Sequence, residues 1–253
     1  MYMSSTTLSL PTKERVISFI WQHLLLLISL NFMTLGVALC IKSDLGSSVI
    51  SSLPLSCSMA GQQGMAPALT VGGYTIIMNF ILVFLQILVL RRRFNPLQLF
   101  QLVIGFVFGW LIDMNMMLTS GIQCDTLLEK AITQFAGCAV MGAGIAFEVK
   151  CGSVTMPGEG FPVALSRITG IPFPKMKIVV DTSLVILAVA SSFLFFSKWE
   201  WNIIGPGTLF AMFFVGWEIK LINPHIQWFD RLLHYRPGFR RYIVGLARFI
   251  YKK

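Results

Sequence analysis

The sequence predicts an all-α membrane protein with six transmembrane helices, arranged as two inverted three-helix repeats with short half-helical or re-entrant segments. Three features predict this fold: a low charge content, six long apolar runs and an internal repeat. Of the 253 residues, 55% are hydrophobic and only 12% are charged. A soluble domain usually carries about 25% charged residues, so most of this chain is expected to face lipid or other helices.

The apolar runs are each long enough to cross a bilayer, which takes roughly 20 residues. The first run follows Lys13 and Arg15 and is too long for a signal peptide, and it lacks a clear A-x-A cleavage site. It is therefore interpreted as an uncleaved first span. The six predicted spans cover residues 16–41, 71–90, 97–118, 131–149, 176–196 and 202–222.

The distribution of basic residues predicts the orientation. If the N-terminus is cytoplasmic and the spans alternate, 17 of the 20 Lys and Arg residues lie on the cytoplasmic side, and only Lys42, Lys130 and Lys198 lie outside. Cytoplasmic loops favour Lys and Arg, so both termini are predicted to be cytoplasmic. Because the basic residues sit in short loops and the tail, the net charge of +9 does not indicate a nucleic-acid partner.

An internal repeat divides the chain. The segment GVALCIKSDLGSSVISSLPLS from Gly36 resembles GIAFEVKCGSVTMPGEGFPVALS from Gly144, and in both a Lys precedes a Pro by twelve positions. Downstream, Asn79 aligns with Asp181, and Gly109-Trp110 aligns with Gly216-Trp217. Each unit holds three spans, so the second must enter the membrane inverted, an arrangement common in secondary transporters.

The repeat gives the expected domain organisation. The first three-helix repeat covers 1–118, an outer linker covers 119–130, and the second repeat covers 131–224. Residues 225–253 form a basic amphipathic tail, which is expected to lie on the anionic inner leaflet.

Two polar segments are the candidate site. Lys42–Ser48 and Lys150–Gly160 each lead into an apolar stretch, 49–60 and 161–168, that is too short to cross the membrane. Such a stretch fits a half-helix lining a cavity. An inward-pointing helix N-terminus with a nearby Lys suits an anion, while Glu159 could pair with a cationic group or carry a proton. Ordinary interfacial loops with snorkelling lysines are the alternative.

The candidate substrate-binding residues come from these segments and from one aligned pair in the spans. Asn79 and Asp181 are included because they occupy equivalent repeat positions. Asp113, Glu148, Asp181 and Glu218 all lie near predicted span ends. Exposure at the interface is the alternative explanation for Asp181 and the expectation for the other three. The candidates are Lys42, Asp44, Ser47, Ser48, Asn79, Lys150, Thr155, Gly158, Glu159, Gly160 and Asp181.

The sequence contains no pattern that indicates an enzyme, a cofactor or a metal site. The five cysteines show no CxxC spacing and no neighbouring His, which gives no metal site and no disulfide framework. HExxH, GxSxG and P-loop motifs are absent, and the three histidines lie at the predicted cytoplasmic edge. No catalytic residue is therefore assigned.

At these same residues the chain resembles the bacterial YczE/YyaS/YitT-like membrane family, in its uncharacterised branch. The matching pieces are Gly36–Ser52, Arg91–Met114 and Met156–Gly160. The resemblance implies a multi-span helical fold in the bacterial inner membrane. It departs at Ser47-Ser48-Val49, where many relatives have Ser-Pro-Trp, so a shared ligand does not follow.

The expected function is a secondary transporter or exporter of a small polar or anionic metabolite. The alternative is a non-transporting membrane factor that supports another complex. Expected partners are the lipid bilayer and a small-molecule substrate. The Gly105–Gly109 GxxxG match allows close helix packing, within the chain or in a homodimer.

Overall fold

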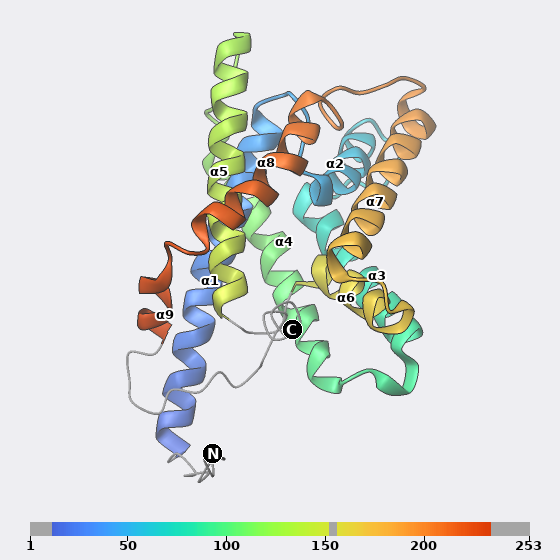
Figure 1. Cartoon of the computed structure of the whole chain (residues 1–253). Coiled ribbons are helices and arrows are strands. Elements are labelled where there is room, and N and C mark those ends of the chain that lie inside the picture. The colour runs from blue at the N-terminus through green and yellow to red at the C-terminus, as the bar shows by residue number, and fades with distance from the viewer. Residues whose placement is uncertain (1–11, 152–155, 234–253) are drawn as a thin grey trace.

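The computed structural model describes residues 12–151 and 156–233, and every regular element within them is helical (Figure 1). Eight helices hold the bulk of this part of the chain, and α9 (Gln227–Leu233) follows them. Two short 3-10 turns, Arg91–Arg93 and Pro96–Leu99, join α3 to α4. The eight are α1 (Thr12–Lys42), α2 (Val49–Gln62), α3 (Val71–Leu90), α4 (Phe100–Leu118), α5 (Leu127–Cys151), α6 (Pro157–Thr169), α7 (Phe173–Phe196) and α8 (Pro206–Ile222).

Five stretches of helix are long and apolar enough to cross a membrane, as expected of a multi-pass helical membrane protein. They are Phe19–Lys42, Val71–Arg93, Pro96–Leu118, Leu127–Cys151 and Phe173–Phe196, and they match five of the six predicted spans.

The sixth predicted span, 202–222, stays a prediction. Its helix, α8, has 17 residues and is not among the five. It begins later than expected because Gly205 is its N-cap and Pro206 its first residue, a position at which Pro is favoured. The residues before Gly205 form turns instead, with Ile203 and Ile204 donating to the Glu200 carbonyl.

The helices are apolar outside and partly polar inside. Large apolar side chains such as Phe84, Leu194 and Phe213 are 58%, 77% and 76% exposed, a surface that a water-soluble monomer rarely presents. In the interior, Asn115 of α4 donates to Asn31 Oδ1 at 3.1 Å and to Thr34 Oγ1 at 2.9 Å, both on α1. Such interhelical hydrogen bonds are typical of membrane bundles.

The longest packing seam joins α1 to α5, which run in opposite directions. Glycines allow the backbones of the two helices to approach closely. A Cβ at Gly36 would lie 2.5 Å from the Gly137 carbonyl oxygen and from the Met141 nitrogen, and one at Gly144 would lie 2.6 Å from the Met33 nitrogen. Because these neighbours are backbone atoms, only residues without a Cβ fit this seam.

The two short helices share a design. Ser48 and Met156 are the N-caps of α2 and α6, and each helix carries a proline, Pro54 or Pro162, as its sixth residue. A proline supplies no N–H to the carbonyl four residues earlier. Within these helices that carbonyl belongs to Ile50 in α2 and to Gly158 in α6.

The packing pairs of the first four helices recur among the next four, with one exception. The contacts of α1 with α4 match those of α5 with α8, and α2 packs on α7 as α6 packs on α3. The contacts of α2 with α3 likewise match those of α6 with α7. The exception is that α3 packs along α4, whereas α7 and α8 have no comparable packing in the part of the chain that the structure describes.

Candidate functional site

A cavity of about 570 Å³ lies between the helices. Residues from α1, α2, α4, α5, α6, α7 and α8 line it. Its walls are largely apolar and include Val37, Phe108, Met141 and Phe213. The volume falls within the range of small-molecule sites, which are mostly apolar clefts with a few polar groups.

The N-terminal ends of both short helices face this cavity. Ser48, Val49 and Ile50 line it from the start of α2, and Met156 and Glu159 line it from the start of α6. The two predicted polar segments, about 108 positions apart in the sequence, therefore contribute to one site. Each helix start adds a partial positive charge to the wall.

Three charged side chains line the cavity: Glu159, Lys177 and Asp181. Lys177 and Asp181 are one turn apart on α7 and form an ion pair at 2.8 Å. The Oε2 atom of Glu159 is buried and accepts no hydrogen bond from the described residues. Glu159 interacts electrostatically with both Lys177 and Asp181. The site thus has two acids, one lysine and one carboxylate oxygen without a hydrogen bond.

A second carboxylate lies behind Glu159. Glu148 of α5 accepts a hydrogen bond from the Met156 backbone N–H at 3.3 Å, and it interacts electrostatically with Glu159. A carboxylate from the chain itself therefore occupies the N-terminus of α6, where the sequence predicted an anionic ligand.

The expectation that Glu148 and Glu218 are exposed at the interface is wrong. Glu148 is only 5% exposed and Glu218 only 7% exposed. Glu148 is buried because α5 continues past it to Cys151 and the start of α6 returns beside it. Glu218 of α8 packs on Gly142 of α5, whose missing side chain leaves room for the carboxylate. Asp113 of α4 joins the start of α3, where it accepts hydrogen bonds from Thr70 Oγ1 at 2.6 Å and from the Gly72 N–H at 2.8 Å.

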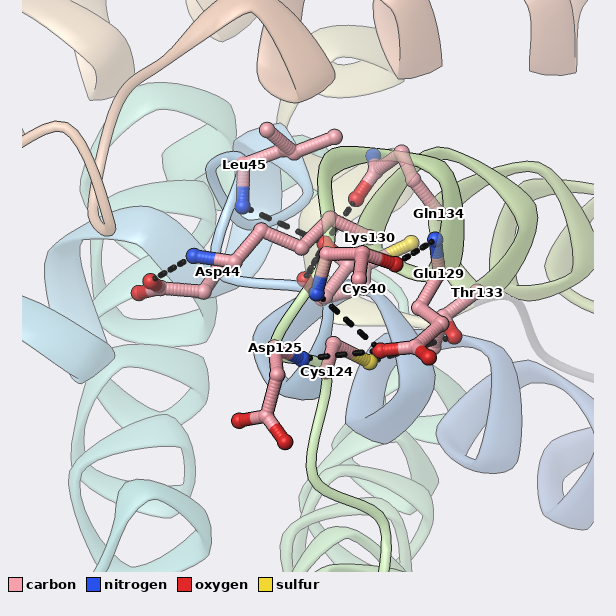
Figure 2. A network of polar contacts seen from close by, with 11 residues as sticks. Cys40, Asp44, Leu45, Cys124, Asp125, Glu129, Lys130, Thr133 and Gln134 are labelled. Atoms are coloured by element: carbon pink, nitrogen blue, oxygen red, sulfur yellow. Dashed lines mark hydrogen bonds and ion pairs between the residues drawn. The ribbon is translucent and has the colours of Figure 1, made fainter.

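The polar segment after α1 is mostly held by structural bonds (Figure 2). Asp44 pairs with Lys130 at 2.6 Å, and Ser43 donates to Gln134 Oε1 at 2.6 Å. Both partners lie in the first eight residues of α5. Gln134 also donates to the Gly207 carbonyl at 2.9 Å. The segment therefore ties α1 to α5 and α8, and among its candidate residues only Ser48 lines the cavity.

The Asp44–Lys130 pair predicts a small effect on stability. Asp44 is 43% exposed at its side chain and Lys130 is 24% exposed, and such ion pairs contribute about 0–1 kcal/mol. Asp44→Asn and Lys130→Gln are each expected to lower stability by less than about 1 kcal/mol and to leave solute binding unchanged. A double-mutant cycle of thermal unfolding in detergent measures the coupling. A loss of binding in Asp44→Asn would instead restore Asp44 to the site.

The remaining candidates lie away from the cavity or support its wall. Lys42 ends α1, and Lys150 donates to the Ile226 carbonyl at 3.1 Å. Ser47 donates to the Ile203 carbonyl at 3.1 Å. Thr155 lies outside the described residues. None of the first three lines the cavity.

Gly158 and Gly160 let α6 pack closely. A Cβ on Gly158 would collide with Ile50 of α2, and one on Gly160 would lie 2.7 Å from Gln101 Oε1 and 2.9 Å from Gln86 Oε1. Those two glutamines are bonded to each other at 3.0 Å across α3 and α4. The two glycines therefore position Glu159, which lies between them.

Asn79 and Asp181, the aligned pair, have different surroundings. Asn79 is buried and donates to the Gly105 carbonyl at 3.3 Å, which binds α3 to α4. Asp181 lines the cavity, and α8 does not pack along α7 in the way that α4 packs along α3. Gly109 and Gly216 repeat this contrast. A Cβ on Gly109 would lie 2.5 Å from Ile76 of α3, whereas one on Gly216 would meet nothing within 4 Å.

Lys177 is the charged cavity residue that the sequence interpretation missed. It was counted only among the basic residues that set orientation. Its spacing of four from Asp181 is the helical spacing for an ion pair, and this signal could have identified it.

Comparison with known families places the chain. The model of a family of unknown function, DUF6198, matches residues 20–224. The chain belongs to this family. All residues lining the cavity fall within the DUF6198 region, since they range from Met33 to Ile219. No curated protein and no solved structure matches the chain. The DUF6198 match provides no link to the YczE/YyaS/YitT-like family, so that resemblance stays a prediction.

Proposed function

We propose that this DUF6198 protein is a secondary transporter or exporter of a small polar or charged solute in the bacterial inner membrane. The observation that carries the proposal is the single cavity faced by the N-terminal ends of α2 and α6. Transporters commonly bind substrate between repeats, near broken or short helices.

We also propose six spans arranged as two inverted repeats, with α8 as the sixth. The recurrence of packing pairs supports this. If α1, α2, α3 and α4 are exchanged with α5, α6, α7 and α8, every packing pair among these helices has a counterpart except the pair of α3 with α4. The opposite directions of α1 and α5 support it too. Arg91–Arg93 and the starts of α1 and α7 lie towards the same end of the molecule (Figure 1), which supports a cytoplasmic assignment for that end.

The charge of the site changes the preferred solute. The anion preference came from the two helix N-termini and was strengthened by Lys42 and Lys150, neither of which lines the cavity. Acids outnumber lysine there by two to one, so a neutral polar or cationic solute fits better than an anion.

Efflux from proteoliposomes tests transport. Vesicles are loaded with a uniformly ¹³C-labelled bacterial metabolite extract, and released solutes are identified by mass spectrometry. One or a few solutes are expected to leave faster with the wild-type chain than with Gly216→Trp, because the indole would project into the cavity and obstruct it. Gly216 lines the cavity and has open space at its Cβ.

Gly121→Trp is the matched control, since Gly121 is exposed and also has open space. Its efflux should equal that of the wild type. Equal release from wild-type and Gly216→Trp vesicles, for every solute, would contradict transport and favour the non-transporting accessory factor.

A further inference from the structure

The cavity has a side opening between α7 and α8. Ile178 of α7 and Phe213 of α8 both line the cavity, yet they are 58% and 76% exposed. The same two helices lack the packing that closes α3 against α4. A lining residue with most of its surface exposed marks the rim of an opening.

The rim of this opening is apolar. Ile178 and Phe213, the two large exposed residues that line it, both carry hydrocarbon side chains. α7 is one of the five helices that can span a membrane. An opening beside such a helix, bordered by exposed apolar side chains, faces the hydrocarbon of the bilayer.

The polar groups are gathered at one wall. Glu159 lies on α6, and Lys177 and Asp181 lie on the second and third turns of α7. The opposite walls, from α1, α5 and α8, contribute apolar side chains. A ligand that satisfies both walls needs a polar head and an apolar body.

The sign of the head group follows from the pairing of the charges. Lys177 is already bonded to Asp181, whereas the buried Oε2 of Glu159 accepts no hydrogen bond from the described residues. A buried carboxylate is costly without a cationic or hydrogen-bonding partner, and an ammonium group supplies both.

We infer that the cavity binds an amphipathic organic amine, which enters from the bilayer between α7 and α8 and places its ammonium group on Glu159. An inorganic cation would leave the apolar walls unfilled. This inference rests on the proposed transport site and names its substrate class.

Binding of two fluorescent probes to the full chain in lipid nanodiscs tests it. Monodansylcadaverine carries an ammonium group, and 11-(dansylamino)undecanoic acid carries a carboxylate on the same fluorophore. The amine is expected to bind at least tenfold more tightly than the acid. Gly216→Trp should weaken amine binding at least tenfold, and Gly121→Trp should leave it unchanged.

Each alternative result has a defined meaning. Equal binding of the two probes, or tighter binding of the acid, would overturn the amine assignment. Amine binding that survives in Gly216→Trp would overturn the location, provided that the variant elutes as a single folded species in size-exclusion chromatography. A shift in the oligomeric state of Gly216→Trp without amine binding by the wild type would assign the opening to a second copy of the chain.

The inference and the proposed function can fail separately. Binding of the amine needs no flux. If the chain binds the amine but releases no labelled solute, the amine site stands and the transport proposal fails. If the chain releases a solute but does not bind the amine, the transport proposal stands and the substrate class is overturned.

Discussion

Glu159→Gln is expected to weaken binding of the dansyl amine by at least about 30-fold, because removal of one partner of a buried charge pair costs about 2–5 kcal/mol. The tighter binding of the amine relative to the acid should disappear. The side chains of Gln and Glu have nearly the same shape, so the close packing of Gly158 and Gly160 against their neighbours should persist. The dissociation constants of both probes measure the effect.

Asp125→Asn is the matched control for this change. It removes one carboxylate of an exposed residue in the connection between α4 and α5, and binding should be unchanged. In the efflux assay, Glu159→Gln should lower release of the transported solute by a similar factor. If Glu159→Gln bound the amine and released the solute as well as the wild type does, this carboxylate would not contact the solute.

Gly36→Ala is expected to destabilise the whole bundle, since its Cβ would lie 2.5 Å from backbone atoms of Gly137 and Met141. Helix backbones cannot move aside as a flexible side chain can, so α1 and α5 must separate. Overpacking of this kind costs about 1–3 kcal/mol, and the thermal midpoint should fall by about 5 °C or more. Gly36→Leu should abolish folding.

The thermal midpoint in detergent, followed by size-exclusion chromatography, measures this effect. Gly144→Ala should behave like Gly36→Ala, because its Cβ would lie 2.6 Å from the Met33 nitrogen. Gly121→Ala, with open space at its Cβ, serves as the control. An unchanged midpoint in both seam variants would mean that α1 and α5 do not cross this closely.

Local sequence patterns were sufficient for most of the helices. Runs of about 20 apolar residues predicted five spans to within a few residues, and the Gly, Ser and Pro content predicted two short segments where α2 and α6 form. The start of α8 was missed because hydropathy does not register that Gly205 and Pro206 define the first turn.

The site was only partly predictable because it depends on which helices pack together. Among the candidate residues, Ser48, Glu159 and Asp181 line one cavity. Asn79 and Asp181 looked equivalent in the repeat, yet only Asp181 lines the cavity, and α4 packs along α3 whereas α8 does not pack along α7 in this way. No local pattern encodes that difference. Glu148 and Glu218 were misjudged for the same reason, because burial near a helix end is set by neighbours distant in sequence.

The prolines in α2 and α6 have a mechanical consequence. Pro54 and Pro162 leave the carbonyls of Ile50 and Gly158 without a donor four residues on, and these two residues touch each other across the helix pair. Each short helix is thus weakest at the turn that borders the cavity. The two proline-weakened turns therefore lie next to each other, and each has one backbone hydrogen bond fewer than a regular helical turn.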